Sequence, residues 1–525
     1  MPSIGPCSPT LVSPVTGSVN SYPESSSTRD ILQDDIPRVT PEPSDVLPGW
    51  LSDLTALPSP LTSGLETSQA GSSHFIDNTS DFINTRSQGS IDMQQVIVRS
   101  GLDLSTQRSH VPKTIHIDLF GNSEIDKSMS HYNEHVADLL LPIDHSANPF
   151  RNLYLSTALK GVACLNLNIT PLGSVVYSAL SNSLIATSAF HIWNQNRDQA
   201  KYREIGVRYR YCAIQALRIA MRETGPGPDY RVLVMVMLCL VTIGVMSGQD
   251  DDFRMHLDAV REWRETRSRW KLLSHSTRQL GEIGSFLSLL ARTFEFRPSA
   301  ASWPYNISSL EQEVIESSSC YEYMYGVTPA IAGAIHQACN LAEHLSRFRD
   351  VGQDLPEDFL EACEELGNKL ESWHFENENT TSIPKEDELR YLLLACQAKA
   401  WHAAALIYYF YRIHGTPSEQ LMQEVDCVLD NLNAAEELKP VSDKATMAPF
   451  TWPGLIASLT TTKPNRHLWA AWWQKMARYR IANIDKQWGL IQQIWGIMDH
   501  EEVEGKGRRN WIEVFTELGI HLLPA

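Results

Sequence analysis

The feature that most constrains the fold is an uninterrupted apolar run near the middle of the chain. Between Val232 and Met246 there is no charged side chain, and Gly248 then interrupts the pattern. A helix that is apolar on every side must be covered on every side. A membrane span would need about 20 apolar residues, and this run is shorter. The sequence therefore predicts a buried core helix, with the other helices packed around it, and no membrane segment.

From about residue 129 onwards, apolar residues recur at helical spacing, and proline or glycine marks the breaks. No stretch shows convincing strand alternation. We therefore predict an all-α fold over residues 129–525, an irregular multi-helix bundle of helical hairpins. Besides the core run, the expected helices are His131–Leu141, Val175–Trp193, Ala200–Met221, Ser276–Phe296, Thr328–Arg349, Pro356–Trp373, Glu388–His414, Glu419–Leu438, Ala448–Leu459, Asn465–Ala482, Gln487–Met498 and Trp511–Leu518.

The first 128 residues differ in composition from the rest, because Ser, Thr, Pro and Gly dominate most of them. Such a segment buries too little apolar area to offset the entropy of ordering, so residues 1–128 are predicted to form a disordered tail. Within it, Asp30–Glu66 mixes acidic residues with Trp50 and several leucines. This pattern is typical of activation segments that fold into a coactivator groove. An ordinary acidic linker would have the same composition, and both interpretations stay open.

The charge balance and the motifs argue against an enzyme and against a basic nucleic-acid surface. The net charge is −18, and none of the nine cysteines forms a C-x-x-C pair. No P-loop, H-E-x-x-H or G-x-S-x-G motif is present. His336 and His344 lie two helical turns apart, and the adjacent Glu364 and Glu365 point in different directions, so structural and solvated roles are expected. We therefore predict no catalytic, cofactor-binding or metal-binding residues.

A set of motifs occurs in an order that resembles a known regulatory domain. The chain is similar to the C-terminal regulatory domain of fungal zinc-cluster transcription factors, in the subgroup of arginine-catabolism and GABA-utilisation regulators. The resemblance covers about residues 129–525. It implies an all-α domain without catalytic residues, located in the nucleus, that controls metabolic or secondary-metabolite genes. The motifs are HYNEHVADLLL from His131, NPFR from Asn148, SALSNSLIATSAFHIW from Ser178, YRYCAIQALRIAM from Tyr209, His256-Leu257-x-Ala259, YMYGVTPAIAGAIHQACNLAEH from Tyr323, WHAAALIYYFYRI from Trp401, Trp452-Pro453, QQIW from Gln492 and WIEVFTELGIHLL from Trp511.

Two departures from the family pattern shape the functional expectation. Family members begin with a six-cysteine binuclear zinc cluster that binds DNA, whereas only Cys7 precedes Cys164 here. After Trp452 and Pro453, the family's Ala-Gly-Cys run is replaced by GLIASLTT. The resemblance without a zinc cluster therefore implies a regulator that does not contact DNA directly. It would act through other transcription factors, through coactivators or as a homodimer.

Two alternatives to this regulator stay open. A start upstream of Met1 would restore the zinc cluster, so the sequence could represent a truncated gene model of a DNA-binding factor. A cytosolic all-α interaction scaffold is the other alternative, and exclusion from the nucleus would distinguish it. The short basic cluster Lys506–Arg509 fits either an import signal or a charged loop.

A small-molecule effector would require an apolar pocket inside the helical domain. We predict that such a pocket is lined by the Val232 helix and by the aromatic segment Tyr391–Tyr411. The tryptophan-rich stretch Trp452–Trp473 fits two roles, a part of the core or a wall of this pocket.

Overall fold

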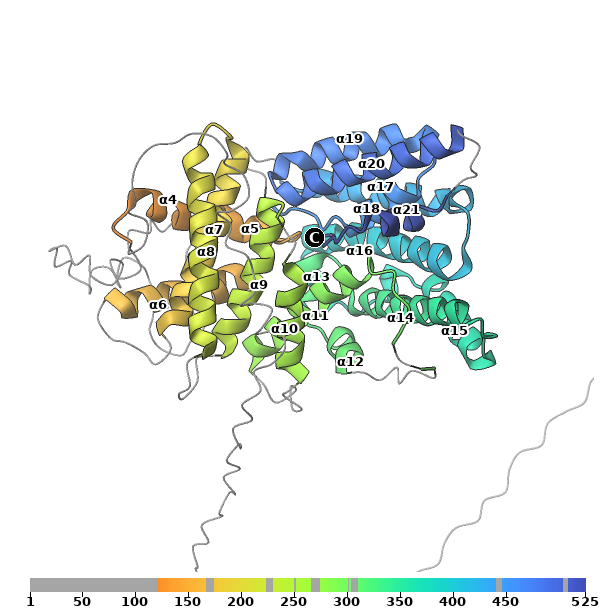
Figure 1. The fold of residues 1–525 in the computed structure, drawn as a ribbon, viewed down its shortest axis with the longest axis horizontal. Coiled ribbons are helices and arrows are strands. Elements are labelled where there is room, and N and C mark those ends of the chain that lie inside the picture. Colours follow the sequence, from red (N-terminus) through yellow and green to blue (C-terminus); the bar gives the residue numbers. More distant parts are fainter. Residues whose placement is uncertain are drawn as a thin grey trace, which may run out of the picture. The chain divides into compact units, whose positions relative to one another are not determined.

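The computed structural model describes residues 120–166, 174–222, 230–249, 252–265, 274–300, 302–303, 310–440, 446–503 and 509–525. Within these ranges all regular secondary structure is helical and no strand occurs, which confirms the predicted all-α class (Figure 1). The activation segment Asp30–Glu66 and the tail up to residue 119 lie outside the described residues. The division at residue 128 stays a prediction, although the first described helix already begins at Ser123.

The described part of the chain is a succession of helices. In chain order they are α4 (Ser123–His131), η1 (Tyr132–Val136), α5 (Ala137–Leu139), η2 (Phe150–Leu155), α6 (Ser156–Asn166), α7 (Ser174–Gln195), α8 (Ala200–Arg222), α9 (Tyr230–Ser247), α10 (Phe253–Glu265), α11 (His275–Arg292), α12 (Leu310–Glu316), α13 (Tyr321–Tyr325), α14 (Pro329–Val351), α15 (Glu357–Glu371), η4 (Phe375–Asn377), α16 (Glu388–Tyr409), η5 (Phe410–His414), η6 (Ser418–Leu421), α17 (Met422–Leu438), α18 (Trp452–Thr460), η7 (Lys463–Asn465), α19 (Arg466–Met476), η8 (Ala477–Tyr479), α20 (Ala482–Val503) and α21 (Trp511–Leu518).

The apolar run forms helix α9, which is covered on all sides as predicted. Every residue from Val232 to Val241 is at most 5% exposed. Helix α7 packs along one side of α9, and α10, α11 and α20 contact it elsewhere. By length and composition α9 is the one described helix that could cross a membrane, but 78% of it is buried inside the protein. It therefore serves as the central rod of the bundle.

The end of α9 is fixed by a glycine and by a buried asparagine. Gly248 adopts φ +74° and its amide donates to the Gly244 carbonyl at 2.8 Å, the left-handed conformation that glycine permits at a helix end. Asn194, at the end of α7, donates to the carbonyls of Met246 at 2.7 Å and Arg480 at 3.0 Å. This side chain therefore joins the ends of α7 and α9 to the turn before α20.

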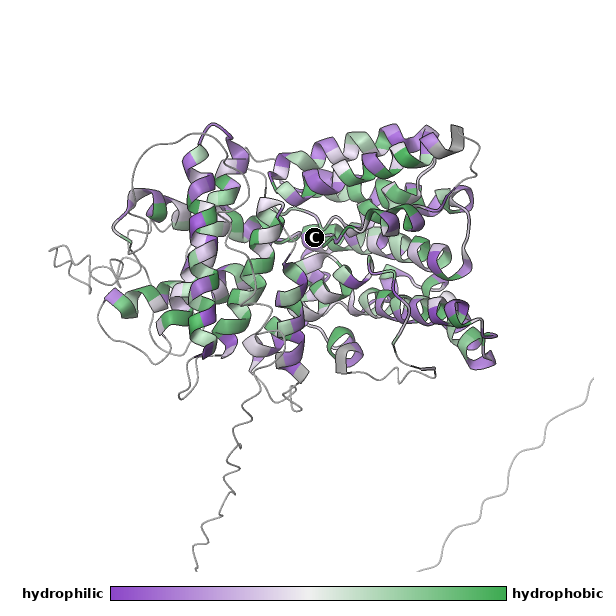
Figure 2. Ribbon diagram, viewed as in Figure 1, coloured by the Kyte–Doolittle hydropathy of each residue, from purple (hydrophilic) through white to green (hydrophobic). Residues whose placement is uncertain are grey.

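Helical hairpins surround the central rod, as the sequence predicts. The longest is α7–α8, whose two helices lie side by side along their length (Figure 1). Helices α16 and α17 form a second hairpin. Outer helices such as α8 and α15 mix hydrophilic and hydrophobic residues (Figure 2). On α8 the hydrophobic side faces α7, with Tyr202, Ala213 and Leu217 buried, and Arg203 and Arg208 are exposed.

A group of three histidines lies where α7 meets α4 and η1. The ring of His191 is 2% exposed, and its Nδ1 lies 2.9 Å from Nε2 of His131. The rings of His131 and His135 are 4.7 Å apart. The pKa of His191 is lowered to about 4, with burial as the largest cause. A hydrogen bond with the Tyr479 backbone opposes the effect of burial, and the charge on His135 adds to it.

We expect His191 to make the protein sensitive to acid. Its folded-state pKa of about 4 lies below the unfolded value of 6.5, so the unfolded chain binds the proton first. The contribution is complete above pH 6.5 and is lost as the pH falls towards 4, by about 3 kcal/mol in total. Urea unfolding at a series of pH values should show a shallower loss of stability for His191→Gln than for the wild type. The exposed His374, changed to Gln, should keep the wild-type slope, and equal slopes for all three proteins would contradict the prediction.

Candidate functional site

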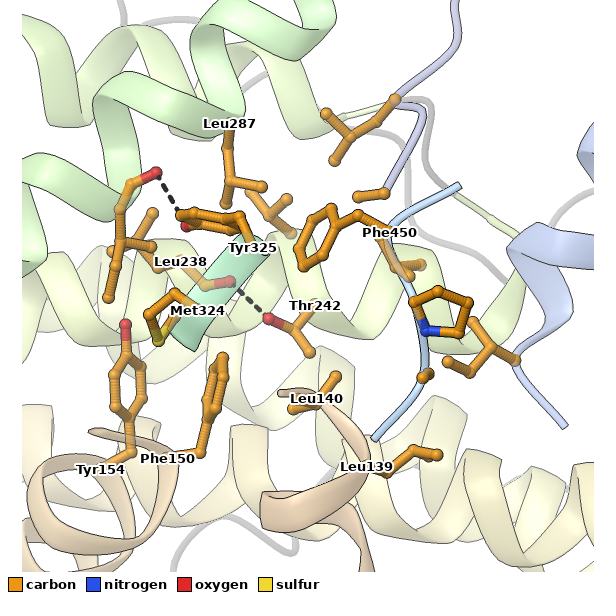
Figure 3. Close-up of a pocket in the computed structure, with 18 residues that line it drawn as sticks. Leu139, Leu140, Phe150, Tyr154, Leu238, Thr242, Leu287, Met324, Tyr325 and Phe450 are labelled. Carbon is orange, nitrogen blue, oxygen red and sulfur yellow. Dashed lines mark hydrogen bonds between the residues drawn. The ribbon is translucent and has the colours of Figure 1, made fainter. Parts of the chain in front are cut away.

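An apolar cavity lies beside α9, where the first helices of the domain meet the later ones (Figure 3). Its volume is about 70 Å³. Helix α9 contributes Leu238 and Thr242 to the wall, and α11 contributes Leu287. The remaining walls come from α5, η2, α13, the segment before α18, Ile481 just before α20, and the residues after α21. The cavity therefore touches segments that are far apart in the sequence.

The wall formed by η2 owes its shape to a π-helix. This helix carries Phe150 and Tyr154, whose ring centroids are 5.6 Å apart and which both line the cavity. A π-helix has more residues per turn than an α-helix, so residues four apart fall closer to one face. Between them on η2, Arg151 points the other way and is 2% exposed. Its Nη2 donates to Asp138 Oδ1 at 2.7 Å, and its Nη1 donates to the Asn133 carbonyl at 2.7 Å.

The opposite wall is a strap of four residues, Met447–Phe450, between α17 and α18. The amides of Met447 and Ala448 donate to the carbonyls of Asp138 at 3.2 Å and Leu139 at 3.0 Å. Met447 has φ +57°, a conformation that non-glycine residues rarely adopt. Its carbonyl accepts a hydrogen bond from Nζ of the buried Lys439 at 2.6 Å. The strap is therefore held from both sides while it presents Phe450 to the cavity.

Lys439 belongs to a buried polar cluster behind the strap. Its Nζ contacts the Glu436 carboxylate and lies 2.9 Å from the Tyr479 hydroxyl. Arg478 also donates to Glu436. Burial lowers the pKa of Lys439 to about 8, and the charge of Glu436 acts in the opposite direction. This cluster anchors the strap and does not open into the cavity, because none of its residues lines it.

The short helix α13 closes a third side with Met324 and Tyr325. It ends at Gly326, which has φ +68° and lies so close to Gln397 that a Cβ atom would overlap the Gln397 Oε1. Glu322, on the same helix, is 3% exposed and accepts backbone hydrogen bonds from residues 381–383, the closest from Ser382 at 2.8 Å. These contacts fix α13 in the one position where it can line the cavity.

The cavity is almost entirely apolar, and no charged side chain of the described residues lines it. The Thr242 hydroxyl donates to the Leu238 carbonyl at 3.0 Å, and the Tyr325 hydroxyl lies 3.5 Å from the Ile283 carbonyl. Figure 3 shows these two hydrogen bonds and none at Tyr154, whose side chain is 1% exposed. Burial is the main cause that raises the pKa of the Tyr154 hydroxyl, so it stays a neutral donor.

The sequence-based expectation for the pocket is half correct. Helix α9 lines the cavity as predicted, but the segment Tyr391–Tyr411 does not. The reason is that α13 and α18 lie against α16: Trp401 donates to the Tyr325 carbonyl at 3.0 Å and stacks on Trp452 at 5.1 Å. Of the two roles open for Trp452–Trp473, the structure shows the core role. None of its residues lines the cavity, and Trp452, Trp469, Trp472 and Trp473 are at most 2% exposed.

The other side chains singled out from the sequence do not come together. His336 bonds to Gln312, while His344 packs edge-on against Trp303 at 5.3 Å. Glu364 and Glu365 are both exposed, in agreement with a solvated role. Of the basic cluster Lys506–Arg509, only Arg509 is described, and it pairs with Glu517 at 2.7 Å. Among the described residues no group of three or more His, Cys, Asp or Glu side chains is placed to hold a metal ion.

Several cavity residues lie in segments for which the sequence predicted no helix or the wrong boundary. Phe150 and Tyr154 are four residues apart, which is a helical spacing, but no helix was predicted between Leu141 and Val175, where η2 and α6 lie. The strap Met447–Phe450 was expected to begin a helix, but α18 starts only at Trp452. The two prolines, Pro449 and Pro453, are the available signal, since proline favours the first turn of a helix and disfavours helix just before it.

Comparison with known proteins identifies the family of the chain. The chain is 22% identical to arginine metabolism regulation protein II of Saccharomyces cerevisiae, over 81% of this chain and 59% of the relative. It thus spans about 59% of the length of that curated protein. No solved structure matches it. The sequence model of the fungal specific transcription factor domain matches residues 128–525, a stretch that holds α9, the cavity and every helix after α4, and the chain therefore belongs to that family.

Proposed function

We propose that the chain acts in the nucleus as a transcriptional regulator whose helical domain relays a signal to transcription factors or coactivators. The observation that carries the proposal is the family match over residues 128–525. Similarity to a protein named for the regulation of arginine metabolism supports control of metabolic genes. The net charge of −18 favours protein partners over the phosphate backbone of DNA.

The apolar cavity is the place where we propose that a small-molecule effector binds. Its walls come from α5 and η2 on one side and from α13 and the strap on the other, with α9 between them. A ligand that touches all of these walls would favour the arrangement in which they close around it. Occupancy would thereby change the surface that the domain offers to its partners.

The segment Asp30–Glu66 is proposed to supply the contact with coactivators. Fused to a heterologous DNA-binding domain, it should activate a reporter gene, because its acidic residues keep Trp50 and the leucines available for a partner groove. Changing Trp50, Leu51 and Leu54 to Ala should abolish this activation while it leaves the acidic residues in place. Reporter activity is the measurement.

The neighbouring residues 67–103, equal in length to Asp30–Glu66, provide the matched control and should not activate. Silence of the 30–66 fusion would remove the activation role. Fluorescence microscopy of the full chain gives an independent check. Exclusion from the nucleus under all conditions would instead favour a cytosolic interaction scaffold.

A further inference from the structure

We propose that the cavity beside α9 binds a small neutral molecule with a short apolar body and one hydroxyl or carbonyl group, which hydrogen-bonds to the Tyr154 hydroxyl. This inference deepens the proposed function and rests on it only in calling the bound molecule an effector. The binding itself is a property of the folded domain. The proposal excludes from the cavity any ligand that carries a charged amino-acid head group.

The lining chemistry decides against a charged ligand. Burying an ionised group without a partner of opposite charge costs several kcal/mol, so a charged head group needs a paired side chain. No charged side chain of the described residues lines the cavity. Buried charges near these walls already have partners: Arg151 pairs with Asp138 and Lys439 with Glu436. The buried Glu282 and Glu322 accept hydrogen bonds from Ser318 and from the backbone of residues 381–383. No side chain of the lining would therefore compensate an α-amino or α-carboxylate group for its lost hydration.

Among the polar side chains of the lining, one remains as an anchor for a ligand. Thr242 uses its hydroxyl proton on the Leu238 carbonyl, and Tyr325 directs its hydroxyl to the Ile283 carbonyl. Tyr154 remains, with its ring beside Phe150 and Met324, and no hydrogen bond joins its hydroxyl to the other residues drawn in Figure 3. A ligand oxygen beside this hydroxyl would accept a hydrogen bond from it at an otherwise apolar wall.

The volume fixes the size of the ligand. A water-sized group occupies roughly 10–15 Å³ on this measure, so a cavity of about 70 Å³ accommodates about five or six non-hydrogen atoms. The walls are formed by branched aliphatic side chains such as Leu238 and Leu287 and by the flat rings of Phe150 and Phe450. A branched chain of four or five carbons with one oxygen matches this space.

Binding of the ligand would also raise the stability of the folded protein. It would contact α9, η2, α13 and the strap at once. A molecule that binds only the folded state stabilises it in proportion to the logarithm of its concentration above Kd. The melting temperature of the purified chain is therefore a direct readout.

The test compares one branched hydrocarbon tail without a head group and with three different head groups. The probes are 3-methylbutan-1-ol, 2-methylbutane, isovalerate and L-leucine, with L-arginine added as a cationic amino acid. The full chain should be stabilised most by 3-methylbutan-1-ol, less by 2-methylbutane, and not by the three charged probes. Calorimetric titration should give the same order of affinities. Stabilisation by isovalerate, L-leucine or L-arginine that is lost when the cavity is filled would overturn the neutral class.

Three variants locate the binding. Tyr154→Phe should weaken 3-methylbutan-1-ol about three- to tenfold and leave 2-methylbutane unchanged, since it removes one hydrogen bond and keeps the ring. Leu287→Trp and, as a second filling variant, Val245→Phe should abolish binding of both. Leu389→Trp, at a 53% exposed position on α16, is the matched control and should bind as the wild type does.

The outcomes separate this inference from the proposed function. Equal affinity of the alcohol for the wild type and Tyr154→Phe would overturn the anchor. Binding that persists in both filling variants, or no binding of any probe, would overturn the site. None of these results depends on reporter activity or on nuclear location, so the transcriptional role stands or falls by its own experiment.

Discussion

Replacing Arg151 with methionine should lower the free energy of unfolding by about 3–5 kcal/mol, because it leaves the buried Asp138 carboxylate without its charged partner. Arg151 is 2% exposed and donates to Asp138 and to Asn133. Methionine has a similar length and keeps most of the packing, so the loss reports on the ion pair. Denaturant unfolding of the purified chain, followed by circular dichroism, measures the change.

A double substitution tests the cause of this large loss of stability. In the double variant Arg151→Met/Asp138→Leu no buried charge is left alone, and much of the stability should return, because a buried pair can often be exchanged for apolar residues with little net cost. Arg349→Met, at an exposed position near the end of α14, should change stability by less than about 0.5 kcal/mol. A loss in Arg151→Met no larger than in Arg349→Met would contradict the role assigned to the pair.

The same substitution bears on the cavity, because Arg151 lies between Phe150 and Tyr154 on η2. Its bond to Asp138 joins this wall to α5, and the Asp138 carbonyl holds the strap through Met447. Removal of the Arg151–Asp138 ion pair should therefore shift both the η2 wall and the strap. Where the variant is still folded, its affinity for a neutral probe should fall although Arg151 does not line the cavity.

The core helix shows what the sequence can predict well. A helix without charges from Val232 to Met246 must be covered by other helices, and the structure places it at the centre of the bundle. The division of α8 into a buried and an exposed side also follows from the spacing of its apolar residues. Tyr202 and Leu217 are buried, and Arg203 is exposed. In each case the burial of many side chains outweighs any single local preference.

The cavity shows where the sequence becomes ambiguous. Periodicity marks α16 as apolar and aromatic, but it does not say which helix lies against which face. Trp401 of α16 meets Trp452 and the Tyr325 carbonyl, so the aromatic face is used to fill the core and not to form a hollow. The actual walls, Phe150 on a π-helix and Phe450 on an irregular strap, depend on backbone hydrogen bonds between segments distant in the chain.

Trp452→Ala should destabilise the protein by about 3–5 kcal/mol, the second large effect expected, because it removes a fully buried tryptophan and leaves a cavity in its place. Its side chain is 0% exposed, stacks on Trp401 with an interplanar angle of 11°, and donates from Nε1 to Thr293 Oγ1 at 2.9 Å. Trp452→Phe, which keeps an aromatic ring but loses the donor, should cost less. Thermal and denaturant unfolding of both variants measure the series.

Two comparisons make this prediction specific to the core position of Trp452. Trp193→Ala, at a half-buried tryptophan covered on one face by Arg197, should cost clearly less, since part of that ring already meets water. The affinity of folded Trp452→Ala for a neutral probe should remain near that of the wild type, because Trp452 does not line the cavity beside α9. A variant that kept its stability but lost probe binding would reverse the assignment and make Trp452 a wall of the effector site, the role that the sequence alone had left open.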